Sequence, residues 1–290
     1  MTEAHSICEV SATLGEGPIW VARDAALWFV DIKAPCVYRF RPKDSALDCW
    51  DAPEHIGWVI PAEDGCFLAG MASGLHRFTP HDDGSFELHA EVETDRPGNR
   101  LNDAAVDPAG RVWFGSMDNA ENAATGHLYR WQAGEITRAK AAPVVITNGP
   151  AISPDGRTLY AVDTLAGQIH AYPITDDGHL GEPRLFVTID PKDGHPDGAT
   201  ADTEGGVWIG LYGGWAARRY APDGTCTDIV DFPVANVTKI ALGGSDGRTA
   251  YATTARQGLD AAALAQQPLA GNLFTFRVAV PGVPVTPVRL

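Results

Sequence analysis

Short runs of apolar residues recur along this chain, and each run has an aromatic residue near its centre. The spacing between these aromatic residues is roughly 40–50 positions throughout. The aromatic residues of the six runs are Trp28, Phe67, Trp113, Tyr160, Trp208 and Tyr251. Runs of this length are typical of strands. A repeat of this period that is built from short strands predicts a β-propeller with one blade per repeat.

Each repeat contains more than one strand. A turn rich in Gly and Asp precedes the aromatic run, as in SPDGR (153–157), and such turns favour hairpins. A further strand that ends in an aromatic residue follows, as in VYRF (37–40), and then a weaker apolar stretch, as in 46–50. The pattern predicts an all-β, six-bladed β-propeller with about four antiparallel strands per blade. We expect residues 1–290 to form a single domain, in which 260–266 is at most a short helix.

A ring of blades needs a terminal segment to complete one of its sheets, since closure removes the exposed edge that an open sheet would carry. Two segments have the apolar pattern of a closing strand, namely SICEVSA (6–12) and VTPVRL (285–290). Either could complete the ring.

Charge and composition narrow the function. The net charge is −15 and the sequence pI is about 4.9, which argues against partners that require a basic face, namely nucleic acid and anionic membranes. The sequence shows no apolar run of about 18 residues and no signal peptide at its start. The five cysteines show no CxxC motif or paired spacing. We therefore expect a reduced, cytoplasmic protein, and we expect it to be a monomer.

Aligning the repeats on their aromatic residues places a polar residue at the same point of five first strands. These residues are Glu16, Asn102, Asn148, Asp197 and Lys239. The second repeat has Gly57 and Trp58 in this region instead. The first strand of a blade is the innermost one, so these side chains should point into the central channel. Neighbouring Gly or Pro residues, as in GEGP (15–18), would let backbones approach closely there.

Three of these residues predict a metal site. Glu16, Asn148 and Asp197 come from separate blades and should converge at the axis. Two buried carboxylates that face each other are costly unless a cation neutralises them. Their oxygen donors suit Ca²⁺, Mg²⁺ or Mn²⁺, and Fe²⁺ is compatible, whereas Zn²⁺ more often takes nitrogen or sulfur. We expect one divalent cation, with its identity open among these five.

Several short motifs, in order along the chain, resemble the regucalcin/gluconolactonase/luciferin-regenerating-enzyme family. They include LGEGPIW (14–20), RLND (100–103), TNGP (147–150), PDG (196–198) and NVTK (236–239). The resemblance implies a six-bladed propeller that holds one divalent metal and hydrolyses sugar lactones. The expected substrate is a pentono- or hexonolactone such as xylonolactone or gluconolactone.

The same resemblance implies roles for individual residues. Glu16, Asn148 and Asp197 match the metal ligands, and Asp197 also matches the residue with the acid/base role. Arg100 and Asn102 match residues that hold the substrate. A further acid of the family falls in GSMDNAEN (115–122), where Asp118 and Glu121 both lie near its position and Glu121 is the candidate for substrate contact.

Aromatic residues in three predicted loops, Trp58, Tyr212 and Trp215, could stack on a sugar ring at the channel mouth or pack between blades. GGSDG (243–247) fits the string of a nucleophile elbow, but it lies at a hairpin position, so we do not expect Ser245 to be catalytic.

Two other functions fit the same pattern. One is a non-catalytic propeller that binds a metal or another ligand, because a fold does not fix a function. The other is a metal-dependent hydrolase of other esters or of phosphotriesters, which would have an apolar pocket in place of a hydroxyl-binding one.

Overall fold

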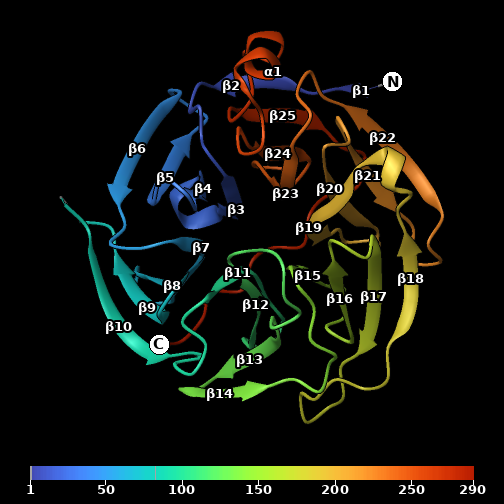
Figure 1. Cartoon of the computed structure of the whole chain (residues 1–290). Helices are drawn as coiled ribbons and strands as arrows, with labels where there is room; N and C mark the ends of the chain where they lie inside the picture. The colour runs from blue at the N-terminus through green and yellow to red at the C-terminus, as the bar shows by residue number, and fades with distance from the viewer. Residues whose placement is uncertain (1, 82) are drawn as a thin grey trace.

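The computed structural model describes residues 2–81 and 83–290, and their strands form six sheets arranged as a ring (Figure 1). Each blade has four antiparallel strands. They run in chain order from the centre of the ring to its rim in five blades, whereas the N-terminal segment supplies the outer strand of the sixth. The prediction of an all-β, six-bladed β-propeller is confirmed.

The innermost strands are β3 (Gly15–Val21), β7 (Ile56–Pro61), β11 (Asn99–Val106), β15 (Thr147–Ile152), β19 (His195–Ala201) and β23 (Val237–Gly243). The second strands, which contain the six aromatic residues of the repeat, are β4 (Ala26–Asp31), β8 (Phe67–Met71), β12 (Val112–Asp118), β16 (Thr158–Asp163), β20 (Val207–Tyr212) and β24 (Thr249–Thr254). The third strands are β5 (Cys36–Arg41), β9 (Gly74–Thr79), β13 (Leu128–Gln132), β17 (Gln168–Pro173), β21 (Ala216–Tyr220) and β25 (Leu273–Arg277). The outer strands are β6 (Ala46–Asp51), β10 (Ser85–Glu91), β14 (Glu135–Arg138), β18 (Arg184–Thr188), β22 (Cys226–Asp231) and, in the sixth blade, β2 (His5–Cys8).

The repeated aromatic residues hold neighbouring blades together. Trp28 of β4 packs on Phe67 of β8, with ring centroids 4.3 Å apart, and both side chains are buried. The inner strands β3, β7, β11, β15, β19 and β23 contact one another in turn around the channel. Apolar burial between sheets therefore builds the ring, and it leaves the polar ends of the inner strands to line the centre.

The N-terminal segment closes the ring. β2 pairs antiparallel with β25, so the predicted closing strand at 6–12 is confirmed over His5–Cys8. β1 (Thr2–Glu3) adds a short parallel strand to the fifth blade beside β22. The alternative at 285–290 is wrong, since this segment forms only an isolated bridge between Val288 and Ala62. The C-terminal chain instead crosses behind the centre of the ring (Figure 1).

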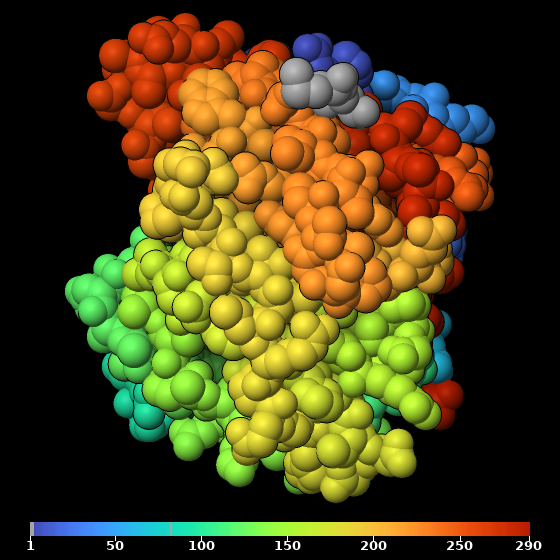
Figure 2. Space-filling model, turned by 90° about the vertical axis from the view of Figure 1, so that its right-hand side faces the viewer, coloured from blue at the N-terminus to red at the C-terminus, as the bar shows by residue number. Residues whose placement is uncertain are grey.

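The helix predicted within 260–266 is present as α1 (Ala261–Gln266), and the Asp260 carboxylate caps it by accepting a hydrogen bond from the Ala263 N–H at 2.8 Å. Short 3₁₀ turns occur at η1 (Ala22–Asp24) and η2 (Pro191–Asp193). Figure 2 shows the α1 region projecting from one face of the ring and the C-terminal chain on the opposite face. Within the described chain, no helix has the length and apolar character needed to cross a membrane.

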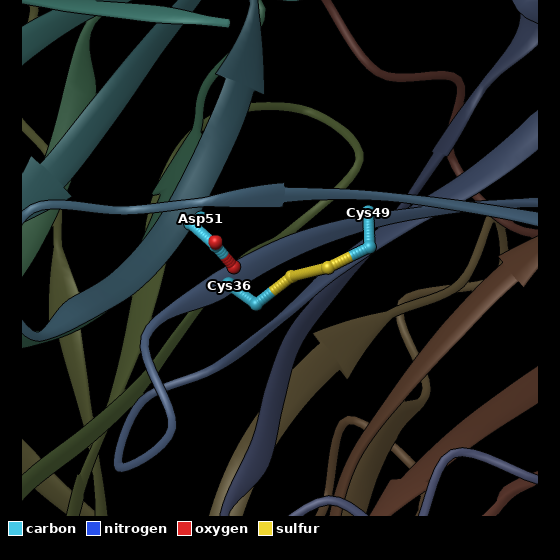
Figure 3. Close-up of side chains that lie close together, drawn as sticks. All are labelled: Cys36, Cys49 and Asp51. Atoms are coloured by element: carbon cyan, nitrogen blue, oxygen red, sulfur yellow. A yellow bond between two sulfur atoms is a disulfide. The ribbon is translucent and has the colours of Figure 1, made fainter. Parts of the chain in front are cut away.

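The expectation that all cysteines are reduced is wrong for two of them. Cys36 of β5 and Cys49 of β6 form a disulfide, with their Cα atoms 6.4 Å apart (Figure 3). Strand pairing sets Tyr38 opposite Cys49, which brings the two cysteines together diagonally across the hairpin. Asp51 lies beside them (Figure 3). Because each sulfur is bonded to the other, neither is a thiolate that could ligate a metal here.

Candidate active site

A β-bulge interrupts each inner strand close to the predicted polar position. The pairing register shifts after Glu16 in β3 and after Asn148 in β15, and it shifts across Asp197 in β19. The corresponding shifts in β7, β11 and β23 lie at Gly57, at Asn102 and Asp103, and at Thr238 and Lys239. A bulge turns a side chain out of the alternating pattern of a strand. In the five blades other than the second, which has Gly57 at this point, the repeated bulge therefore turns a polar side chain toward the channel.

The structure brings all six predicted site residues to one cavity of about 200 Å³ at the end of the channel. Five of them come from inner strands, namely Glu16, Arg100, Asn102, Asn148 and Asp197. The sixth, Glu121, comes from the loop after β12. Tyr212, a candidate for stacking on a sugar, also lines the cavity. The other lining residues, which the sequence did not indicate as ligands or substrate contacts, are Leu14, Met117, Ile146, Thr164, Leu165, His195 and Gln257.

Hydrogen bonds fix the amide and guanidinium groups of this cavity. The Arg100 Nη1 donates to Asn102 Oδ1 at 2.6 Å. The Asn102 Nδ2 in turn donates to Asn148 Oδ1 at 2.8 Å and to the Thr147 carbonyl at 2.7 Å. The Asn148 Nδ2 donates to Thr164 Oγ1 at 2.9 Å. Because the Asn148 nitrogen is bound by Thr164, its amide oxygen is the atom left for a metal ion. That oxygen accepts one hydrogen bond from Asn102 and keeps a second lone pair. No motif in the sequence indicates this role for Thr164.

The two acidic residues of the cavity are strongly perturbed. Burial, and then the neighbouring Asp103 carboxylate, raise the pKa of Glu16 to about 8. Burial, and then Glu16, raise the pKa of Asp197 well above its ordinary value. Burial also lowers the pKa of Arg100 to about 10. Two carboxyl groups that disfavour each other's ionisation in a buried cavity form a site that a positive charge would stabilise.

A buried ion pair spans the channel behind these residues. Lys239 of β23 donates from Nζ to Asp103 Oδ1 of β11 at 2.5 Å, and both side chains are almost fully buried. The stem of Lys239 lies on Gly198, where an added Cβ would come within 2.5 Å of it. Lys239 also lines a second cavity of about 130 Å³, which the C-terminal residues 283–286 help to enclose. Neither residue lines the candidate site, but both act electrostatically on Glu16 within it. The sequence placed Lys239 in the channel, but its partner lies three blades away.

The donor set fits a divalent cation. Across residues 2–81 and 83–290, no group donates a hydrogen bond to the Asp197 carboxylate, although that residue is only 6% exposed. Glu16 Oε2 accepts one bond, from the Gly17 N–H at 2.9 Å. Two buried carboxylates with so few protein partners, beside the Asn148 amide oxygen, offer three oxygen donors from three blades. Glu16, Asn148 and Asp197 are thus the residues that would hold the ion.

The conformation of the loop after β12 distinguishes Asp118 from Glu121, the two acids that the sequence left as alternatives. The carboxylate of Asp118 turns back on its own loop and accepts hydrogen bonds from the backbone of Ala120, Asn122 and Ala123. The bonds from Asn122 and Ala120 lower the pKa of Asp118. Glu121, in the left-handed region at φ 59°, lines the cavity. Asp118 shapes the loop, and Glu121 is the acid within reach of a ligand.

The three aromatic candidates for stacking on a sugar lie in different environments. Tyr212 lines the cavity and donates from its hydroxyl to the Gln257 carbonyl at 2.5 Å. The prediction that Trp58 could stack on a sugar is wrong, because Trp58 is buried between blades and its indole lies against Gly70. Trp215 is 46% exposed and does not line the cavity. Ser245 lies in the turn between β23 and β24, without a following helix, as expected for a hairpin residue.

The fold and the cavity define the class as a six-bladed β-propeller with a polar site in its channel. Comparison with known proteins identifies the family within this class. The model of the SMP-30/gluconolactonase/LRE-like region matches residues 14–256, so the chain belongs to this family. The chain is 35% identical to 6-deoxy-6-sulfogluconolactonase of Pseudomonas putida, over 93% of each chain. It is 36% identical to L-arabinolactonase of Azospirillum brasilense, over 94% of this chain and 91% of the relative. A crystal structure of the calcium-binding protein regucalcin from Agrobacterium tumefaciens superposes with a TM-score of 0.93 at 28% identity, covering 100% of this chain and 98% of the other.

Arg100 gives a first prediction for this cavity. We expect Arg100→Ala to raise KM for a lactone by about tenfold or more and to change kcat less, because the predicted charged hydrogen bond to substrate would be lost both before and after attack. Steady-state kinetics with the metal content measured in parallel would test this. Arg100→Lys, which keeps the positive charge but lacks the paired N–H donors of the guanidinium group, is the matched control. A fall in kcat at constant KM would instead assign Arg100 to the transition state.

Proposed function

We propose that this protein is a divalent-metal-dependent lactonase that opens a pentono- or hexonolactone to the aldonic acid. The observation that carries the proposal is the convergence of Glu16, Asn148 and Asp197 from three blades on one cavity that Arg100 and Asn102 also line. The two curated relatives described above are named for sugar lactones, which supports the same substrate class. The cofactor is one divalent cation, with Ca²⁺, Mn²⁺, Mg²⁺, Fe²⁺ and Zn²⁺ as the candidates.

In this proposal the chain orients the lactone and moves a proton. Arg100 and Asn102 bind ring hydroxyls, and Glu121 accepts a hydrogen bond from another hydroxyl at the cavity mouth. Asp197, whose carboxylate faces the cavity, accepts a proton from the water that attacks the lactone carbonyl. A bound divalent cation would polarise that carbonyl and stabilise negative charge on its oxygen. Proton return to the ring oxygen completes opening to the hydroxy acid.

The polar side chains that converge on the cavity, among apolar walls that include Leu14, Met117 and Ile146, favour a sugar lactone over the two alternatives. A hydrolase of aryl esters or phosphotriesters would present mainly apolar groups, whereas Arg100, Asn102, Glu121 and Tyr212 offer several hydrogen bonds. A propeller that only binds a metal would not need the guanidinium of Arg100 beside the ligands. We further propose that the chain acts in the cytoplasm as a monomer, with residues 1–290 as a single domain.

Initial rates on a panel of substrates would test the proposal. The panel contains D-glucono-1,5-lactone, D-xylono-1,4-lactone, L-arabino-1,4-lactone, an aryl ester and a phosphotriester, each assayed with each candidate cation. Spontaneous ring opening is subtracted from every rate. We expect kcat/KM to be largest for an aldonolactone. A larger kcat/KM for the aryl ester or the phosphotriester would reject the proposed substrate class, and no turnover of any compound would favour the binding protein.

A further inference from the structure

A continuous chain of hydrogen bonds leads from the predicted metal ligands to Asn119 and Lys33. These two residues do not line the cavity themselves but lie beside its residues Arg100 and Glu121, and we call them the rim. It begins at Asn148, passes through Asn102 to Arg100, and continues from Arg100 Nε to Asn119 Oδ1 at 3.2 Å. Lys33 Nζ donates to the same Asn119 oxygen at 2.8 Å. A lactone with its carbonyl at the metal ligands and its body along Arg100 would therefore point its far end toward Lys33.

Two cations thus share one neutral acceptor at the rim. Among residues 2–81 and 83–290, no carboxylate oxygen lies within 4.0 Å of Lys33 Nζ or of the Arg100 guanidinium. Glu121 is the acid close enough to act on both groups, and it does so beyond that distance. The side chain of Arg100 is 3% exposed, and its Nη2 makes no hydrogen bond to any described residue. Burial and the nearby Arg100 lower the pKa of Lys33, which agrees with an unneutralised pair.

The chain has a net charge of −15, yet no acidic group of the described residues lies within ion-pair distance of Lys33 or Arg100, in contrast to exposed cations such as Lys192 and Arg277. Glu16, Glu121 and Asp197 offset the charge of Arg100 only from beyond ion-pair distance, and Glu121 does the same for Lys33. Positive charge without a direct ion pair, beside a partly buried cavity, attracts an anion and binds it with charge-assisted hydrogen bonds. Lys33 Nζ has two further hydrogens to donate, and Arg100 Nη2 is free. Both donors can reach one anionic group at the rim.

We propose that Lys33, together with Arg100, forms a rim subsite for an anionic substituent on the end of the aldonolactone remote from its carbonyl. The preferred substrates are then acidic lactones, which carry a sulfonate, phosphate or carboxylate, and neutral lactones are poorer substrates. This inference rests on the proposed lactonase function and specifies its substrate class.

The experiment compares 6-phospho-D-glucono-1,5-lactone with D-glucono-1,5-lactone. We expect the parent protein to show a kcat/KM for the phosphorylated lactone about tenfold or more above that for the neutral one. Lys33→Met should lower this ratio about tenfold, whereas Lys33→Arg should preserve it. Lys140→Met is the matched control, because Lys140 is 90% exposed and pairs loosely with Glu182 at 3.7 Å. Added salt should also reduce the ratio, since screening weakens attraction at an exposed rim.

Two outcomes overturn the subsite. One is a parent protein whose kcat/KM for the phosphorylated lactone does not exceed its kcat/KM for the neutral lactone. The other is an equal loss of rate on both lactones in Lys33→Met, which would make Lys33 only an anchor for the loop that carries Asn119. Calorimetric binding of 6-phosphogluconate and of gluconate separates this inference from the proposed function. If neither lactone is hydrolysed, the lactonase proposal fails, and the effect of Lys33→Met on tighter binding of 6-phosphogluconate then decides the subsite alone.

Discussion

Asp197→Asn is expected to lower kcat for the preferred lactone by about 10²–10⁴-fold while KM changes little. The amide keeps one oxygen donor toward a cation, but it cannot accept a proton from the attacking water. The parent carboxylate is suited to that task because no described residue donates a hydrogen bond to it. Steady-state kinetics on variants saturated with metal, with the metal content of each determined by elemental analysis, would measure the effect.

Asp246→Asn is the matched control, since it makes the same chemical change at an exposed turn where Asp246 pairs with Arg277. We expect the control to keep the parent rate. If metal-saturated Asp197→Asn also keeps that rate, Asp197 is a ligand only and the base lies elsewhere. The structure then ranks Glu121 first, because Asp103 is paired with Lys239 and Asp118 is held by its own loop.

Lys239→Met is expected to reduce the free energy of unfolding by about 3–5 kcal/mol, because it leaves the Asp103 carboxylate buried without its partner. Asp103 Oδ2 already has no hydrogen-bond partner among the described residues, so nothing nearby can replace the ammonium group. Denaturant unfolding followed by tryptophan fluorescence would measure the loss. The measurement is made with chelator present, so that metal binding does not contribute to stability.

The double variant Lys239→Met/Asp103→Leu supplies the control for this second prediction. Removing both charges together removes the penalty of the unpaired one, so we expect it to recover most of the lost stability. An additive result, in which the double variant is less stable than Lys239→Met, would show that the pair contributes through packing in the channel and not through its charges.

The sequence contained enough information to predict the ring and the residues that line it. The aromatic repeat located the second strand of every blade, and counting back from it located Glu16, Asn148 and Asp197. That count succeeded because each inner strand has its bulge at the same point, so equal positions in the repeat become equal positions in the channel. Their chemical roles stay a prediction until the variants are measured.

Other features required the three-dimensional structure. The Lys239–Asp103 pair joins blades on opposite sides of the channel, and no local pattern relates residues so far apart. Asp118 and Glu121 could be told apart only from the conformation of their loop. The second blade departs from the repeat because Gly57 occupies its bulge. An added Cβ there would lie 2.4 Å from the Asn102 carbonyl, and the following Trp58 turns into the core.

The same limit explains why the sequence left the closing strand open between two chain ends, and why the expectation for the cysteines was wrong. Both 6–12 and 285–290 have the apolar pattern of a strand, and the choice between them depended on which edge lay next to β25. Cys36 and Cys49 meet because of the register of one hairpin, which spacing along the sequence does not reveal.

Metal depletion and reconstitution would show whether catalysis depends on a cation held by Glu16, Asn148 and Asp197. The protein is stripped exhaustively with chelator, dialysed, and titrated with each candidate cation while bound metal and initial lactone hydrolysis are followed together. The account predicts that activity disappears with the metal and returns as one cation binds per chain, and that Glu16→Ala fails to recover at the same cation concentration. Full lactonase activity in the stripped protein would contradict it.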